Sequence, residues 1–140
     1  MTVARDELIA TAKTYLDGIL AADGSGARLA DDCWRVEQGR NTGTNAEEVR
    51  AALETMSYVK AMRNIRWFVA DDGENVFAWY LLDVEGGVTS FIAERFRVVG
   101  GLIREIEVVF AFAMGAELQQ WPDDPSMVWP RNPDGSYAMS

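Results

Sequence analysis

The chain has 140 residues and a formal net charge of −9, with 49% hydrophobic and 25% charged residues. This composition is typical of one soluble globular domain, and its acidity argues against nucleic acid or an anionic membrane surface as a partner. The sequence has no histidine and a single cysteine, Cys33, which excludes histidine-activated nucleophiles, an intrachain disulfide and a cysteine metal cluster. Acid–base chemistry in this chain must therefore rely on carboxylates, tyrosines and basic side chains.

The N-terminal half is expected to form two helices with a strand between them. Residues 4–22 carry apolar side chains at helical spacing and stop at Asp23-Gly24, which predicts an amphipathic helix. Residues 31–38 alternate as in a strand. Asn45, with Glu48 three residues later, is typical of a capping box. It predicts a second helix whose buried stripe is Val49, Ala52, Leu53, Met56 and Val59.

The C-terminal half is expected to form strands. After the second helix the hydrophobic period changes to two, with runs at 65–70, 76–84, 88–99 and 102–113. Tight turns separate the last three runs at Gly86-Gly87 and Gly100-Gly101. Two helices followed by strands with tight turns predict an α+β domain, in which helices cover one face of a curved antiparallel sheet.

The end of the chain differs from the rest. Residues 116–140 are interrupted by proline but contain Trp121 and other aromatic residues, so we expect a domain at 1–115 and a tail that packs on this domain or on a second subunit. The N-terminus carries charges where a signal peptide needs an apolar core, and no run approaches the roughly 18 apolar residues of a membrane span. A cytoplasmic location is the expectation.

Three strings resemble the NTF2-like superfamily. They are Tyr15-Leu16-Asp17 through Asp23, Ala30-Asp31-Asp32 through Gly39, and the expected last hairpin from Ala93 to Glu107. This superfamily includes SnoaL-type polyketide cyclases, ketosteroid isomerases, dehydratases and cofactorless lyases of aromatic compounds. The resemblance covers about residues 5–115. It implies a conical half-barrel with helices over its concave face, an apolar pocket, no cofactor or metal, and a homodimer.

Strand parity selects candidate pocket residues in the first strand. Arg35 and Glu37 share one face, and Trp34 and Gln38 share the other. The resemblance to ketosteroid isomerases places Glu37 where those enzymes carry their carboxylate base, although a slip of one residue would place Gln38 there. The alternative for Glu37 is a surface ion pair with Arg35 or Arg40.

Two further candidates face the expected core. Tyr15 lies on the apolar stripe of the first helix, similar in position to the isomerases' tyrosine that donates a hydrogen bond to the substrate oxyanion; otherwise it is a core tyrosine. Glu94 shares a strand face with three apolar residues, where burial would raise its pKa and suit it to acid–base catalysis. The alternative for Glu94 is an ion pair with Arg63, Arg66 or Arg104.

The expected function is a cofactor-independent acid–base lyase that acts on a small apolar, aromatic molecule by elimination, dehydration or deformylation. In this reaction Glu37 would remove a proton and Tyr15 would hold the developing oxyanion. Glu94 and Arg35 would balance charge. Aromatic side chains would bind the substrate: Trp34, Trp67, Trp79, Phe96, Phe110 and Trp121.

Alternatives stay open at this point. A SnoaL-like isomerase or cyclase, or a binding module without catalysis, would fit the same fold. The isomerases' second oxyanion donor would fall near Ile92, an apolar residue here, which argues against steroid isomerisation. Trp79 and Tyr80 are adjacent, so only one of them can face the pocket.

Overall fold

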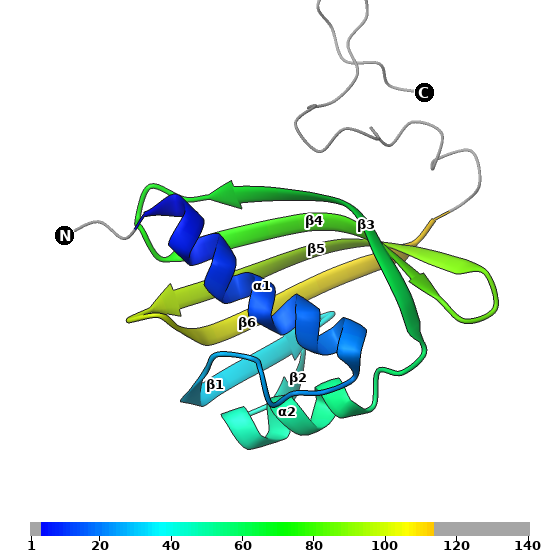
Figure 1. The fold of residues 1–140 in the computed structure, drawn as a ribbon, viewed down its shortest axis with the longest axis horizontal. Coiled ribbons are helices and arrows are strands. Elements are labelled where there is room, and N and C mark those ends of the chain that lie inside the picture. Colours follow the sequence, from blue (N-terminus) through cyan, green and yellow to red (C-terminus); the bar gives the residue numbers. More distant parts are fainter. Residues whose placement is uncertain (1–3, 114–140) are drawn as a thin grey trace, which may run out of the picture.

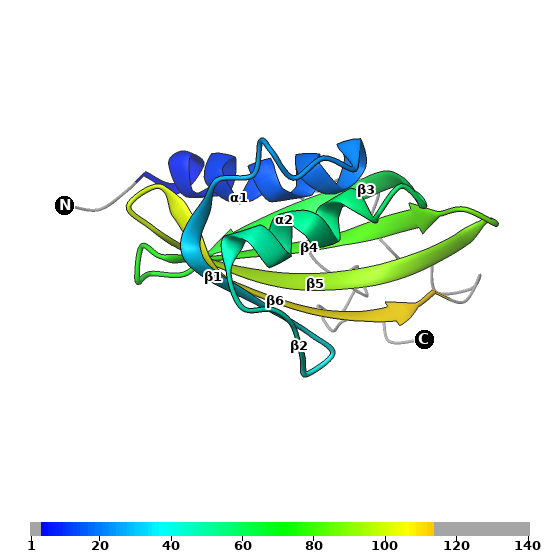
Figure 2. The same cartoon turned by 90° about the horizontal axis from the view of Figure 1, so that it is seen from below.

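The computed structural model describes residues 4–113. They form the helices α1 (Arg5–Ala21) and α2 (Ala46–Glu54) and six strands that make one sheet in the order β2-β1-β6-β5-β4-β3. Figure 1 shows α1 lying across one face of the curved sheet, and Figure 2 shows both helices on the same side of it. The strands are β1 (Leu29–Glu37), β2 (Arg40–Gly43), β3 (Val59–Val69), β4 (Asn75–Val84), β5 (Val88–Val99) and β6 (Leu102–Phe112).

The sheet is mixed. β1 runs parallel to β6, whereas the other neighbouring pairs within residues 4–113 are antiparallel. The expected α+β half-barrel is confirmed, and the parallel pair is its one difference from an antiparallel sheet. Strands β3 to β6 follow one another through short turns and so alternate in direction. β1 meets β6 only after the chain has passed through α2, so no hairpin sets the direction of this pair.

α2 begins where the capping pattern predicts. The Asn45 side chain accepts a hydrogen bond from the backbone N–H of Glu48 at 2.9 Å, and the Glu48 carboxylate accepts one from the backbone of Thr44 at 2.7 Å. The second bond is thus made one residue earlier than in a standard capping box. The helix ends at Glu54, sooner than its apolar stripe predicts, because Val59 already pairs with β4 as the first residue of β3.

The core lies between α1 and the concave face of the sheet. α1 packs against β3, β4, β5 and β6, and α2 packs against β1 and β2. No helix within residues 4–113 is long and apolar enough to cross a membrane. The side chains that α1 buries are Leu8, Ala12, Tyr15, Leu16 and Ile19.

Candidate active site

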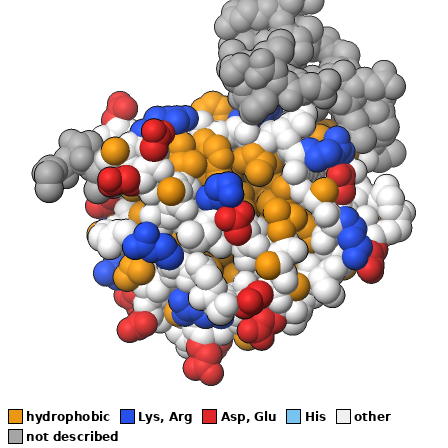
Figure 3. All heavy atoms as spheres, viewed as in Figure 1, with side chains coloured by type: hydrophobic (Ala, Val, Ile, Leu, Met, Phe, Trp, Pro, Cys, Tyr) orange, Lys and Arg blue, Asp and Glu red, His pale blue; other side chains and the backbone are white. Residues whose placement is uncertain are grey.

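A cavity of about 270 Å³ opens on the concave side of the sheet. On the face that carries α1, apolar side chains gather beside the helix (Figure 3). A mostly apolar wall with a few polar groups is typical of a small-molecule site. The polar side chains of the wall are Arg35, Glu37, Tyr58, Tyr80, Ser90 and Glu94, and the apolar ones are Ile19, Met56, Val59, Leu82, Val84, Ile92, Val108, Phe110 and Phe112.

Arg35 on β1 connects the polar groups at the base of the cavity. Its Nε donates a hydrogen bond to the Tyr15 hydroxyl at 2.8 Å. Its Nη1 donates to Glu37 Oε2 at 2.7 Å and to Thr42 Oγ1 at 2.8 Å. Burial lowers the pKa of this guanidinium, but the neighbouring Tyr15, Glu37 and Glu94 raise the pKa by more. Arg35 therefore keeps its positive charge although only 5% of it is exposed.

Glu94 on β5 is the buried carboxyl group of the cavity. It is 2% exposed, and its Oε1 accepts a hydrogen bond from the Tyr80 hydroxyl on β4 at 2.8 Å. Burial raises the pKa of Glu94 to about 7, although the charge of Arg35 and the Tyr80 hydrogen bond act in the opposite direction. A carboxyl group with this pKa can both donate and accept a proton at neutral pH.

Two tyrosines lie at this end of the core. Tyr15 is fully buried with its ring edge against Phe96, at 5.6 Å between ring centroids, and its hydroxyl is held by Arg35. Tyr80 borders the cavity, whereas Tyr15 is not part of the wall. Burial raises the pKa of both phenols. The structure thus places Tyr15 behind Arg35 and outside the wall, which corrects its expected role at a substrate oxyanion. The Tyr80 hydroxyl lies at the wall but donates its hydrogen bond to Glu94.

The register of β1 places Glu37, not Gln38, at the cavity. The Glu37 side chain is 32% exposed and forms an ion pair with Arg35. Glu37 therefore lines the cavity and also forms the ion pair with Arg35 that was its alternative role. The Gln38 side chain instead forms hydrogen bonds with the backbone of Phe110 on β6.

The aromatic candidates separate into two groups. Phe110 lines the cavity, and Phe96 is buried beside Tyr15. Within the described residues the wall includes neither Phe96 nor Trp34, Trp67 and Trp79, which corrects the expectation that these four side chains face the pocket.

The position of each of these three tryptophans has a structural reason. Trp34 alternates with Arg35 along β1 and so faces the other side of the sheet. Trp79 alternates with Tyr80, is 42% exposed, and packs against Phe68 at 5.4 Å between ring centroids. Trp67 packs against the core from β3. Trp121 and the expected tail at 116–140 lie outside the described residues.

Several residues of the site, Tyr80 and Thr42 among them, were not selected from the sequence. In the structure Tyr80 pairs with Ile92, which places Tyr80 on the same face as Glu94. A two-residue turn at Gly86-Gly87 would instead pair Tyr80 with Ala93, so the sequence count alone gives the wrong face. Thr42 lies in β2, a strand of four residues without a hydrophobic period, so no periodic signal identifies it.

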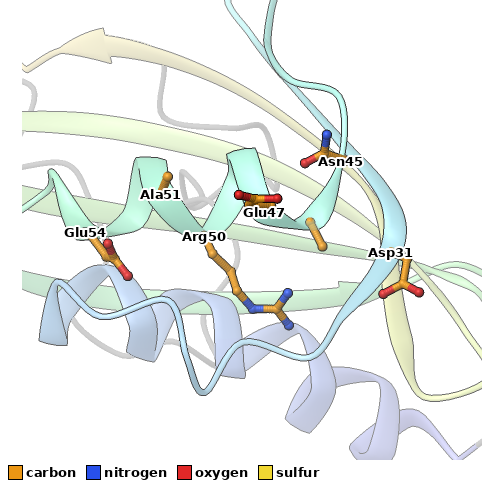
Figure 4. A pocket seen from close by; sticks show the side chains of 7 residues that line it. Asp31, Asn45, Glu47, Arg50, Ala51 and Glu54 are labelled. Carbon is orange, nitrogen blue, oxygen red and sulfur yellow. The ribbon is translucent and has the colours of Figure 1, made fainter.

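A second depression lies along α2, near the start of β1. Figure 4 shows the Arg50 side chain extending from α2 toward the chain that precedes β1, with Glu47 and Asn45 nearby on the same helix end. Its Nη2 donates a hydrogen bond to the Ala27 carbonyl at 3.0 Å. The depression is lined mainly by polar and charged side chains, and Arg50 has a structural role in it. The cavity at Glu94 is therefore the candidate active site.

The fold is similar to that of NTF2-like proteins. The chain is similar to a steroid delta-isomerase from Pseudomonas aeruginosa, with 20% identity and a TM-score of 0.62 over 85% of this chain and 88% of that one. It is also similar to an LEH-like epoxide hydrolase from M. tuberculosis, with 20% identity and a TM-score of 0.61 over 76% and 84%. An NTF2-like protein of unknown function from Cytophaga hutchinsonii has 15% identity and a TM-score of 0.61 over 74% and 89%. At these identities the similarity establishes the fold.

The particular family follows from the sequence. The model of a family described as a domain of unknown function (DUF8021) matches residues 1–110, and the chain belongs to this family. No curated protein matches the sequence. The solved structures confirm the expected NTF2-like fold.

Proposed function

We propose that this protein is a cofactor-independent enzyme that performs acid–base catalysis on a small apolar molecule. The observation that carries the proposal is a pair of carboxyl groups in different surroundings at one apolar cavity. Glu94 is buried with a pKa of about 7, and Glu37 is partly exposed and paired with Arg35. Carboxyl groups in such different surroundings can divide the roles of acid and base.

An elimination such as dehydration uses both groups. Glu37 accepts a proton from a C–H bond next to a carbonyl group. Glu94, close to half protonated at neutral pH, donates its proton to the leaving hydroxyl group, which departs as water. Arg35 supplies fixed positive charge near the carbonyl oxygen where negative charge develops. Glu37 then releases its proton to solvent and Glu94 takes one up, which restores the starting state. A double-bond shift would use the same residues.

A second candidate reaction is the opening of an epoxide. The fold similarity to an LEH-like epoxide hydrolase favours it, together with the acid and base at one cavity. Glu37 would accept a proton from a water molecule whose oxygen attacks a ring carbon. The ring carbon–oxygen bond breaks as Glu94 protonates the ring oxygen, and the product is a diol. Hydrolysis places an oxygen atom from isotopically labelled water in the product, whereas elimination does not.

Nitrobenzisoxazole tests the base directly. This flat, apolar molecule opens to a coloured product when a base removes its C–H proton, and its leaving oxygen needs no acid. We expect the wild-type protein to open it and Glu37→Gln to lose about 10²–10⁴-fold in rate. Glu94→Gln should lose much less, and Glu54→Gln on the exposed side of α2 serves as the control.

A benzylic β-hydroxy ketone tests the acid. Its hydroxide leaving group needs a proton, so both Glu37→Gln and Glu94→Gln should abolish its dehydration. If Glu94→Gln removes activity toward nitrobenzisoxazole and Glu37→Gln does not, the two roles are reversed. If neither variant changes either rate, the protein is not an acid–base enzyme at this cavity.

A further inference from the structure

Gln38 joins the end of β1 to the cavity wall through its side chain. Its backbone has a φ of 51°, in the left-handed region, and the chain turns there into β2. Its backbone N–H donates to the Val108 carbonyl at 3.0 Å. Its side-chain Nε2 donates to the Phe110 carbonyl at 3.1 Å, and its Oε1 accepts from the Phe110 N–H at 2.9 Å.

The side chain replaces backbone groups that the turn removes. In a regular parallel pair, the Phe110 N–H would bond to the backbone carbonyl of Gln38, and the Phe110 carbonyl would accept from a residue further along β1. The left-handed conformation at Gln38 redirects the chain, and the side-chain amide takes both places. A primary amide suits this role because it carries a donor and an acceptor together.

The bond pair ends at a residue of the cavity. Phe110 lines the wall together with Val108 and Phe112, and the rings of Phe110 and Phe112 lie 6.2 Å apart, edge to face. At its other end Gln38 directly follows Glu37, which also lines the wall. One side chain therefore connects the end of β1, which carries the Glu37 carboxylate, to the apolar part of the wall on the neighbouring strand β6.

We infer that Gln38 is a positioning residue that fixes Phe110, and with it the apolar wall of the cavity, relative to the end of β1. The inference rests on the proposed function, because the wall position matters for activity only if substrate binds there. A misplaced wall weakens binding of substrate and transition state alike. Removal of the Gln38 amide should therefore raise KM and leave kcat nearly unchanged.

Substitutions at Gln38 separate its two hydrogen bonds. Gln38→Glu keeps an acceptor for the Phe110 N–H but places a negative charge against the Phe110 carbonyl. Gln38→Met keeps the length of the side chain and removes both bonds. Gln38→Asn keeps donor and acceptor on a side chain shorter by one methylene group and should rescue part of the effect.

The kinetic test uses nitrobenzisoxazole and the full chain. We expect Gln38→Met and Gln38→Glu to raise KM about tenfold and to change kcat by less than about twofold. Val109→Thr is the matched control, because Val109 is the neighbour of Phe110 on β6 and is 57% exposed; it should leave KM unchanged. A variant that lowers kcat and not KM would overturn the inference.

A second readout does not depend on activity. Hydrogen exchange of the Phe110 amide, followed by NMR with labelled phenylalanine, should accelerate about tenfold or more in Gln38→Met because the N–H loses its acceptor. If the wild-type protein is inactive, the proposed function fails, and the dissociation constant of nitrobenzisoxazole replaces KM as the test of Gln38. Unchanged exchange overturns the inference, and so does faster exchange with unchanged binding. If Gln38→Met does not fold, the KM or dissociation constant of Gln38→Glu decides.

Discussion

The Tyr80 hydroxyl donates a hydrogen bond to Glu94 Oε1 at 2.8 Å, between two side chains that are almost fully buried. This bond stabilises the ionised carboxylate and lowers the pKa of Glu94, as does the charge of Arg35. Burial is the larger effect and raises the pKa to about 7, with a smaller contribution from the negative charge of Glu37. The protonation of Glu94 at neutral pH therefore depends on Tyr80.

Tyr80→Phe should shift the pH dependence of catalysis. Without the hydroxyl donor the pKa of Glu94 rises further above its ordinary value. In the proposed dehydration Glu94 must be protonated, so activity falls as pH rises through this pKa. The fall should therefore occur at a higher pH in the variant than in the wild-type protein. The measurement is kcat/KM for the β-hydroxy ketone against pH. Tyr58→Phe removes another hydroxyl of the cavity wall, on a 46% exposed residue that does not shift the pKa of Glu94, and should leave the position of the profile unchanged.

A fall at the same or a lower pH in Tyr80→Phe would contradict this assignment. Activity that rises, rather than falls, through neutral pH in the wild-type protein would show that Glu94 acts as the base. The two results are distinguishable because the first concerns the change between variants and the second concerns the direction of the wild-type profile.

Glu94→Gln should change stability in a pH-dependent way. A folded-state pKa of about 7 against an ordinary value of 4.5 means that the folded protein retains a proton that the unfolded chain releases between these values. The contribution of Glu94 to the free energy of unfolding of the wild type therefore falls as pH rises through this window. Above the window this contribution no longer changes with pH. Glutamine does not titrate, so the variant gains about 3 kcal/mol relative to the wild type between about pH 4.5 and pH 8.

Urea unfolding of both proteins across this pH range measures the difference. The other carboxylates change the unfolding free energy of the two proteins equally, so their effect cancels in the difference. A difference in unfolding free energy that does not change with pH would mean that Glu94 keeps an ordinary pKa, and the proposed acid would then be ionised at neutral pH.

The sequence predicted the site best where strand parity and burial agree. Alternation placed Arg35 and Glu37 on one strand face and Glu94 among apolar residues, and the resemblance to ketosteroid isomerases selected Glu37. All three border the cavity. Tyr15 was placed correctly on the buried face of α1, but the helical period cannot say how deep a side chain lies. In the structure Arg35 lies against the Tyr15 hydroxyl.

Features without a periodic signal could not be predicted. β2 has four residues and three of them are exposed, so neither length nor hydrophobic alternation indicates a strand. The direction of β1 relative to β6 depends on contacts between residues about 70 positions apart. The choice between Trp79 and Tyr80 depends on the length of the turn, because a two-residue turn at Gly86-Gly87 would pair Trp79 with Glu94. In the structure Val84 pairs with Val88 across a three-residue turn, which places Tyr80 on the face of Glu94.

Arg35→Met should destabilise the protein. The substitution leaves the Tyr15 hydroxyl without its donor and the Glu37 carboxylate without its cation. Removing one partner of a buried ion pair costs about 3–5 kcal/mol, and the lower end of this range applies because Glu37 is partly exposed. Chemical denaturation measures the loss. Arg35→Met combined with Glu37→Gln should recover part of it, since the second change removes the unpaired charge. A double variant no more stable than the single one would show that the ion pair contributes little.

Ligand binding should depend on Phe110 and not on Trp79. Phe110 lines the cavity, whereas Trp79 lies on the opposite face beside Phe68. Loss of the Phe110 ring removes apolar contact worth about 1.5 kcal/mol or more, which corresponds to about tenfold weaker binding. Equilibrium dialysis with nitrobenzisoxazole measures the dissociation constants of Phe110→Ala and Trp79→Ala, each combined with Glu37→Gln so that the ligand is not converted during the measurement. Equal weakening in both variants would show that the ligand binds outside the cavity, because one molecule in the cavity cannot contact both faces of the sheet.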